Sequence, residues 1–285
     1  MNCCICDKEL TPSETSPFLT CTECDCFYSK DNDFEYDDNY SMIGKKGVNK
    51  SLFGLRINYE KFINNKGSSL SSRYKVLRRI DPVNAIANEL GIARKTCLDI
   101  GCGSGEFLKL LGEYGYEVFG VDIRNHSEMD CKTYIGDFLA LDINRNFSVI
   151  TMWHVLEHLK NPLEFLRKAY DLLERTGLIV IEVPIIDSWQ FKLFGTKWRC
   201  IRKDHLNYFS IKSLHKIIER AGFKKYSSSL QGSLGLTYYL QRTIARDFDK
   251  VIQHHPFMLP IKKTYLTLCS NLHLGDFYRL FCVKA

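Results

Sequence analysis

Two pairs of cysteines near the start of the chain have the spacing of a metal-binding site. Cys3 and Cys6 form one Cys-x-x-Cys pair, and Cys21 and Cys24 form a second pair after fourteen intervening residues. Each pair can present two thiolates to one tetrahedral zinc ion. A segment as short as residues 1–28 has too little core to fold unaided, and a bound metal would supply the missing stability. We therefore predict a structural zinc site in a ribbon or knuckle.

Two further interpretations of these cysteines stay open. Cys4 and Cys26 lie beside the pairs and could replace one of the four ligands. Alternatively, the thiols bind no metal and lie on the surface, where they would be open to oxidation. Disulfides are disfavoured, because six of the twelve cysteines cluster within the first 26 residues and the N-terminus lacks the pattern of a signal peptide. We therefore expect a reduced, cytoplasmic protein.

A turn with three glycines is the central signal of the chain. Gly101, Gly103 and Gly105 follow the apolar stretch 96–100 and precede a helical pattern that begins at Glu106. Glycine allows a ligand to lie against the main chain, and the amides of a helix N-terminus suit a carboxylate or phosphate. A dinucleotide-binding turn would require a glycine where Glu106 stands, and a P-loop would require a lysine that the turn lacks.

Acidic residues accompany the glycine turn at positions where they can bind a nucleoside. Asp99 precedes the turn, and Asp122 ends the next predicted strand, 17 residues after Gly105. A carboxylate at the end of that strand can accept hydrogen bonds from both ribose hydroxyls. Asp137 follows further along the chain, where it could accept the amino group of an adenine.

A second group of polar residues follows the later predicted strands. Imidazole titrates near neutrality, so His158 and His205 are candidate general bases. Asp204 or Glu157 could orient one of these rings and stabilise its charged form. The same residues can instead cap or tether backbone, or anchor a segment that roofs the site. The whole group comprises His154, Glu157, His158, Asp204, His205 and Tyr208.

In combination, these motifs resemble the class I S-adenosylmethionine (SAM)-dependent methyltransferases. The likeness extends over about residues 73–285. It implies that the three glycines pass the methionine and ribose of the cofactor, with Asp99 near the methionine amino group and Asp122 on the ribose. It further implies that Asp137 and Phe138 face the adenine and that Ile123 and His154 also line the cofactor site. The matching stretches are Leu98–Glu106, Val121–Asp122, Gly136–Asp137 and His154–Leu159.

The later chain resembles bacterial methyltransferases that modify sugars and other small metabolites, many of which carry paired N-terminal cysteines. The stretches concerned include Asp187–Trp189, Gly195–Trp198 and Asp204–Ser210. Sugar C-methyltransferases have a similar layout but usually a longer chain with a further C-terminal domain. The resemblance therefore implies O-methylation of a sugar or nucleotide-linked sugar, as in surface polysaccharide biosynthesis.

The elements that must position these residues alternate between strand and helix patterns. Such alternation predicts βαβ units and an α/β fold, a Rossmann-like parallel sheet with helices on both faces. The resemblance extends this to the seven-stranded methyltransferase sheet with an antiparallel last strand. Predicted strands cover 96–100, 117–122, 149–153, 178–183 and 277–283. Predicted helices cover 106–114, 162–174 with a stop at Gly177, 211–221, and two segments between 51 and 90, the second opened by Asp81-Pro82.

We divide the chain into a zinc-binding module (1–28), a linker with an N-terminal helical segment (29–72) and a methyltransferase domain (73–285). Residues 185–210 would form an insertion that roofs the substrate. The composition, with 45% hydrophobic and 25% charged residues, is that of a globular protein without a membrane span. Residues 1–45 carry ten acidic residues against three lysines, so the remainder is strongly basic and favours an anionic small-molecule acceptor. An oligomer stays possible.

Three alternatives compete with this reading. An RNA methyltransferase with a zinc ribbon would be expected to have a basic module, whereas this one is acidic and would repel a phosphate backbone. A non-catalytic SAM-binding scaffold would retain the cofactor motifs without turnover. Finally, His154, Glu157 and His158 could bind a metal, as in small-RNA 3′-end methyltransferases, whose core is similar; the sequence offers no evident further ligand nearby, which disfavours this reading.

Overall fold

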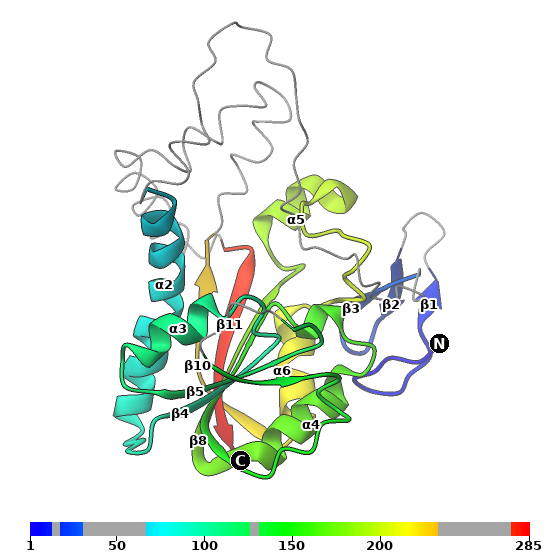
Figure 1. Cartoon of the computed structure of the whole chain (residues 1–285). Coiled ribbons are helices and arrows are strands. Elements are labelled where there is room, and N and C mark those ends of the chain that lie inside the picture. The colour runs from blue at the N-terminus through cyan, green and yellow to red at the C-terminus, as the bar shows by residue number, and fades with distance from the viewer. Residues whose placement is uncertain (13–17, 31–66, 126–130, 233–274) are drawn as a thin grey trace, which may run out of the picture.

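The computed structural model describes residues 1–12, 18–30, 67–125, 131–232 and 275–285 (Figure 1). The predicted connector after residue 30 and any helix between 51 and 66 lie outside these ranges. Within the described ranges, no helix is long and apolar enough to cross a bilayer.

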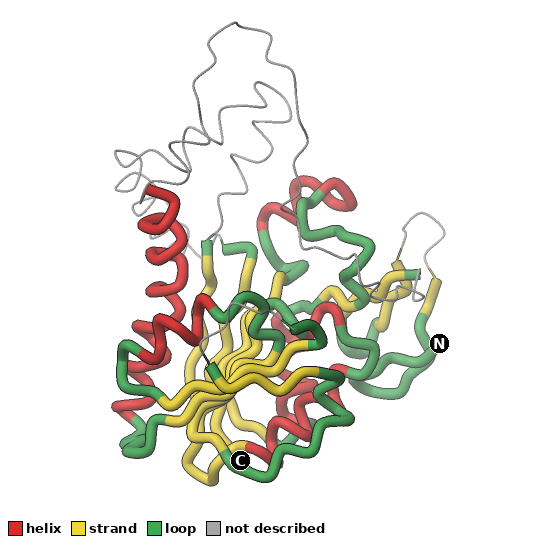
Figure 2. Tube along the Cα trace, in the orientation of Figure 1, coloured by secondary structure: helices red, strands yellow, loops and turns green. Residues whose placement is uncertain are grey.

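A seven-stranded sheet forms the centre of the molecule (Figure 2), with the order β10-β11-β8-β7-β4-β5-β6. Strands β4 to β8 pair in parallel, whereas β11 runs antiparallel to both β8 and β10. This confirms the predicted fold class. The strands are β4 (Thr96–Ile100), β5 (Glu117–Asp122), β6 (Lys132–Ile135), β7 (Phe147–Trp153), β8 (Leu173–Pro184), β10 (Phe223–Gln231) and β11 (Phe277–Lys284).

Helices cover both faces of the sheet (Figure 1). Along β7, Val149 and Trp153 pack with one set of helical residues and Ile150 and Met152 with the other. Because side chains alternate between the faces, a strand buried on both sides reads as a continuous apolar run. One face carries α2 (Gly67–Glu89) and α3 (Glu106–Gly112), and the other carries α4 (Pro162–Leu172) and α6 (Ile211–Arg220).

The predicted helix start at Asp81-Pro82 is wrong, because one helix, α2, runs through Pro82. Proline removes the N–H that would bond to the carbonyl four residues earlier, which here is that of Arg78. Arg279 on β11 donates from Nη1 to this carbonyl oxygen at 2.6 Å. The hydrogen bond that the proline removes is therefore replaced by one from the sheet, and the helix continues.

Gly177 is not a helix stop either. Helix α4 ends at Leu172, and Gly177 lies within β8, where the pairing with β7 shifts register between Phe147 and Val149. A Cβ atom on Gly177 would lie 2.7 Å from the side chain of Leu173 and 2.9 Å from a backbone oxygen. The glycine is thus required by close packing inside the irregular strand.

The N-terminal module shares its sheet with the segment predicted to roof the substrate. Strand β3 pairs antiparallel with β9, joining Phe27 to Tyr208 and Tyr28 to Asn207. The rings of Phe18 and Tyr208 pack edge to face, 4.9 Å apart. This sheet therefore joins two segments that are far apart in the sequence. Its strands are β1 (Thr11–Pro12), β2 (Phe18–Cys21), β3 (Cys26–Ser29) and β9 (Asn207–Tyr208).

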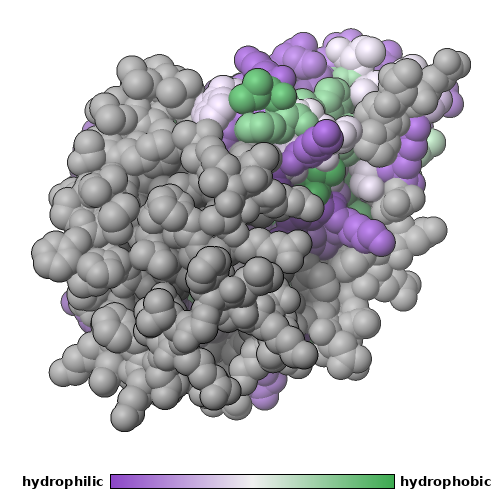
Figure 3. All heavy atoms as spheres, turned by 90° about the horizontal axis from the view of Figure 1, so that it is seen from above, coloured by the Kyte–Doolittle hydropathy of each residue, from purple (hydrophilic) through white to green (hydrophobic). Residues whose placement is uncertain are grey.

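The roof segment also contains a short helix, α5 (Trp189–Phe194), followed by the 3-10 turn η2 (Gly195–Lys197). Leu193 on α5 is exposed. Seen from above in Figure 3, the described part of this end of the molecule mixes hydrophobic with strongly hydrophilic residues.

We predict that Arg279→Met destabilises the fold by about 3–5 kcal/mol, because it leaves the buried Glu182 without its closest cation. Arg279 Nη2 lies 2.6 Å from Glu182 Oε2, and both side chains are almost fully buried. Urea unfolding measures the change. Lys132→Ala, which removes a cation from the exposed pair with Glu117, is the matched control and should change stability little. Equal stability of the two variants would contradict the buried-pair argument.

Candidate active site

The glycine turn between β4 and α3 is locked to the end of β5. Gly103 N donates to Asp122 Oδ2 at 2.8 Å, and Arg124 N donates to Asp122 Oδ1 at 3.0 Å. Gly101 N bonds to the Val121 carbonyl at 2.8 Å. Each carboxylate oxygen has two lone pairs, so Asp122 is fixed in place and can still accept hydrogen bonds from a ligand.

Gly101 brings the turn against the loop that follows β7. Its φ angle is +74°, and a Cβ atom there would lie 2.7 Å from Val155 Cγ2. Any other residue would be strained by the backbone angle and would collide with Val155. The glycine turn and the 154–158 loop are therefore in direct contact.

Asp99 lies beneath the turn and is buried. It accepts a hydrogen bond of 2.6 Å from Thr151 Oγ1 on the neighbouring strand β7. Burial raises the pKa of Asp99 to about 7, although the bond from Thr151 opposes the shift. Its carboxyl group thus changes charge near neutral pH.

The residues predicted to face an adenine lie in different surroundings. Ile123, directly after Asp122, is 50% exposed and offers an apolar surface suited to a flat ring. Asp137 is exposed, and its Oδ1 accepts a bond from Leu139 N at 3.0 Å. Phe138 is buried, with its ring packed 5.4 Å from that of Phe165. The ring of Phe138 therefore belongs to the core.

His154 lies between two buried carboxylates. Its Nδ1 is 3.3 Å from Glu157 Oε1, and its Nε2 is 3.3 Å from Glu182 Oε1. Burial lowers the pKa of His154, but the two flanking carboxylates outweigh burial and raise the pKa above its ordinary value. Glu182 also pairs with Arg279 and Arg79, and this holds the pKa of Glu182 well below its usual range despite burial. His154 is thus one member of a buried ionic network.

The structure brings Glu157, His158 and His205 together, although His205 follows His158 by 47 residues. One ligand atom from each residue lies within 4.8 Å of the others, and the two imidazole rings are 4.7 Å apart at 90°. Glu157 and His205 are 1% and 6% exposed. Burial lowers the pKa of His205 to about 4, so this ring is neutral at physiological pH. Sequence analysis named all three residues as candidates for the site, but nothing in their spacing indicates that His205 lies beside both Glu157 and His158.

The segment that carries His205 is anchored to the loop after β7. Leu206 N donates to the Glu157 carbonyl at 2.8 Å, and Asn207 Nδ2 donates to the Leu159 carbonyl at 2.7 Å. His158 Nδ1 lies 2.7 Å from the carbonyl oxygen of Asp204. These bonds fix the relative positions of the two loops.

Asp204 and Tyr208, both predicted at the active site, lie within this anchoring. Asp204 accepts two hydrogen bonds of 2.8 Å from Arg202, and its Oδ2 lies 3.6 Å from His158 Nδ1. The buried hydroxyl of Tyr208 donates to the Arg202 carbonyl at 3.0 Å, and burial raises the pKa of Tyr208 to about 12. Tyr208 thus holds the backbone at Arg202, and Asp204 holds the side chain of the same arginine.

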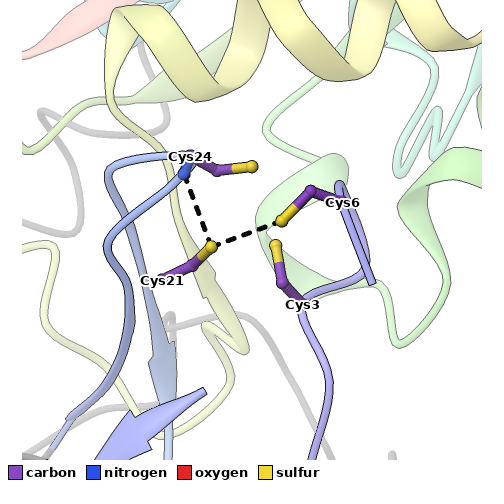
Figure 4. Close-up of side chains that lie close together, drawn as sticks. All are labelled: Cys3, Cys6, Cys21 and Cys24. Atoms are coloured by element: carbon purple, nitrogen blue, oxygen red, sulfur yellow. Dashed lines mark hydrogen bonds between the residues drawn. The ribbon is translucent and has the colours of Figure 1, made fainter. Parts of the chain in front are cut away.

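The four N-terminal cysteines converge as the spacing predicts (Figure 4). One sulfur from each of Cys3, Cys6, Cys21 and Cys24 lies within 4.8 Å of the others. Backbone amides point at two of these sulfurs, Ile5 N to Cys3 and Cys24 N to Cys21, each at 3.4 Å. Four thiolates with amide donors behind them are the ligand set that a structural zinc ion takes.

Neither of the two proposed substitute ligands belongs to the group of four sulfurs that lie within 4.8 Å of one another. The thiols of Cys4 and Cys26 contact the hydroxyl of Tyr28, at 3.4 and 3.3 Å, and the thiol of Cys3 contacts the same hydroxyl at 3.0 Å. The four predicted ligands are thus the set that the structure brings together.

The chain matches the family described as a methyltransferase domain over residues 72–228, more than half of its length, and belongs to that family. Two solved SAM-dependent methyltransferases have the same fold. The one from Clostridium acetobutylicum is 10% identical with a TM-score of 0.51, over 80% of this chain and 99% of the other. The one from Archaeoglobus fulgidus is 23% identical with a TM-score of 0.50, over 80% and 98%. The predicted assignment to the class I SAM-dependent methyltransferases is confirmed.

Curated relatives named ubiquinone biosynthesis O-methyltransferase match a shorter stretch. The protein from Pseudomonas paraeruginosa is 29% identical over 125 residues, 39% of this chain and 54% of the relative. That from Stutzerimonas stutzeri is 27% identical over 123 residues, 38% of this chain and 53% of the relative. The chain thus spans about half the length of the curated relatives it matches.

Proposed function

We propose that this protein transfers the methyl group of SAM to a hydroxyl group of a sugar or nucleotide-linked sugar. The contact between Gly101 and Val155 is the observation that carries the proposal. It sets a turn suited to the cofactor directly against the loop bearing Glu157 and His158. A methyl donor held on the turn would thus lie beside groups able to activate an acceptor.

The cofactor would bind along the ends of β4 and β5. In this proposal Asp122 accepts the ribose hydroxyls, while Ile123 lies against the adenine. Asp99 would attract the methionine amino group, and Asp137 would accept the adenine amino group. The fixed carboxylate of Asp122 supports this arrangement, because a ligand would not have to reorganise it.

Methyl transfer to oxygen is an in-line displacement at the sulfonium carbon. Alignment of the two reactants and exclusion of water supply much of the rate. A sugar hydroxyl is a poor nucleophile at neutral pH, so its proton must leave as the new bond forms. The Glu157–His158–His205 cluster is the group we assign to this activation. The basic character of the chain after residue 45 supports an anionic acceptor, as a nucleotide-linked sugar would be.

A second candidate acceptor follows from the curated relatives. Their name, ubiquinone biosynthesis O-methyltransferase, also specifies methylation at oxygen. An aromatic hydroxyl of that pathway is therefore the alternative to a sugar hydroxyl.

We predict that wild-type protein binds SAM and its demethylated product and that Asp122→Asn weakens both about 10- to 100-fold, because hydrogen bonds to a charged group contribute about 1.5–3 kcal/mol. Calorimetric titration measures the affinities. Asp142→Asn, at an exposed loop position, is the matched control and should bind like wild type. A folded wild type that binds neither compound would disprove the cofactor assignment.

A panel of nucleotide sugars and phenolic acceptors would then identify the class of acceptor by formation of a methylated product. We expect His158→Asn to reduce kcat by about 100-fold or more while SAM affinity stays unchanged, because the acceptor loses its activating group. His215→Asn, a half-buried histidine bonded to Tyr278, is the control. Cofactor binding without turnover on any acceptor would favour the scaffold alternative, and product on RNA alone would favour the RNA methyltransferase.

We further propose that Cys3, Cys6, Cys21 and Cys24 bind a structural zinc ion. Wild-type protein should then release one zinc per chain when a mercurial reagent titrates its thiols. Cys21→Ser should lose this zinc and unfold the N-terminal module, because the ion supplies much of its stability. Cys131→Ser, a half-buried thiol outside the module, should retain it. Unchanged zinc release from Cys21→Ser would refute the site.

A further inference from the structure

The cluster of Glu157, His158 and His205 has the composition of a metal site distinct from the four cysteines. It offers one carboxylate and two imidazoles, with ligand atoms all within 4.8 Å of one another. Two histidines and one carboxylate bind divalent transition metals while leaving coordination positions open for other ligands. A structural site, in contrast, is closed by four protein ligands.

Two members of the cluster are buried polar groups with unused hydrogen-bonding capacity. Within the described part of the chain, neither carboxylate oxygen of Glu157 accepts a hydrogen bond, and Nδ1 of His205 has no partner. Glu157 Oε1 lies 3.3 Å from Nδ1 of His154. Leaving such groups unsatisfied costs about 1–3 kcal/mol each, so native structures seldom retain them unless a ligand or ion uses them.

The third member, His158, is held in the tautomer that suits a metal ligand. Its Nδ1 lies 2.7 Å from the carbonyl oxygen of Asp204. A carbonyl oxygen can only accept, so Nδ1 donates this hydrogen bond, and Nε2 is the ring atom that would bind a metal. Histidines that bind metals commonly donate their other N–H to such a carbonyl, which fixes the ring and raises its basicity.

The cluster is also held rigidly before any ion binds. The bond from Leu206 N to the Glu157 carbonyl joins the two loops next to the ligands, and Asn207 adds a second link to the Leu159 carbonyl. Ligands fixed by their supporting contacts do not have to be ordered at the moment of binding, which favours affinity.

We propose that Glu157, His158 and His205 bind a divalent transition-metal cation, such as Mn²⁺, Fe²⁺, Co²⁺ or Zn²⁺, and that the acceptor oxygen occupies one of its open positions. The second half of this proposal rests on the proposed methyl transfer. The cation would polarise the acceptor hydroxyl, as divalent metals do for bound water. The proton leaves to solvent, the oxygen attacks the methyl carbon, and the carbon–sulfur bond breaks with its electron pair on sulfur. The products are a methyl ether, the demethylated cofactor and one proton.

A titration of the full-length protein with Mn²⁺, followed by electron paramagnetic resonance, tests the site apart from activity. Mn²⁺ prefers oxygen and nitrogen to thiolate ligands, so it reports on this cluster and not on the cysteines. Exchangeable metal would first be removed by a chelator that leaves the thiolate-bound zinc in place, as checked by zinc content.

We expect one Mn²⁺ per chain in the wild type. The affinity for Mn²⁺ should fall about 100-fold or more in Glu157→Gln and in His205→Ala. Substituting a residue that only hydrogen-bonds to a metal ligand already lowers metal affinity about 10- to 100-fold, and a lost ligand should lower it further. His215→Ala should bind like the wild type. Line broadening of an identified acceptor by the bound Mn²⁺ would test whether the acceptor lies on the ion.

Several results would overturn the proposal. The first is a wild type that binds no Mn²⁺, and the second is variants that bind it as tightly as the wild type. Unbroadened acceptor signals would refute acceptor coordination alone. SAM affinity serves as the check on folding, since the cluster variants retain Asp122 and the glycine turn. Should His205→Ala lose SAM binding, Glu157→Gln, which keeps the shape of the side chain, decides the question. A wild type that binds Mn²⁺ but does not bind SAM would refute the proposed function and leave the metal site supported.

Discussion

The lack of any side chain at Gly101 is the constraint on which the rest of the site depends. The side chain of Val155 fills the space where a Cβ atom of residue 101 would lie. The end of β4 and the loop after β7 are therefore separated by this one side chain. The parallel pairing of β4 with β7 brings both ends to one edge of the sheet. From there, Asp122 is fixed on one side of the turn and Glu157 on the other. The distance between the proposed cofactor site and the proposed activating cluster is therefore set by backbone packing.

A network of charged side chains lies behind this edge of the sheet, around a buried glutamate. Glu182, on the strand next to β7, is surrounded by Arg279, Arg79 and His154. Such a network is costly to assemble and strongly destabilising to break, so its members hold one another in fixed positions. Through His154, the network extends to Glu157 and hence to the edge where the chemistry is proposed.

Much of the central sheet could be predicted from the sequence, because its strands are buried on both faces. β4 and β5 were predicted to the residue, as apolar runs bounded by turns. β6 and β10 lie at the two edges of the sheet, where exposed positions interrupt the apolar pattern, and sequence analysis gave no bounds for either.

The errors arose where tertiary contacts override a local signal. Pro82 normally marks a helix start, but the hydrogen bond from Arg279 to Arg78 keeps α2 continuous. Gly177 normally marks a helix end, but it is required in β8 by the side chain of Leu173. The candidate site was predicted in part for the same reason. Glycine and acid spacing locates residues on one βα unit, whereas the approach of His205 to Glu157 depends on two loops that only the folded chain brings together.

The position of Leu206 has a consequence for the N-terminal module. Its carbonyl accepts a bond from Ser29 N at the end of β3, and its own N–H donates to the Glu157 carbonyl. One residue thus connects the cysteine-bearing sheet to the cluster at the end of β7. If each group binds its own ion, occupancy of one stabilises the backbone that positions the other, and the two affinities become thermodynamically linked. Such linkage is reciprocal, so each ion would raise the affinity for the other by the same factor. The ion bound by the N-terminal cysteines would then act as an allosteric effector of the cluster at the end of β7.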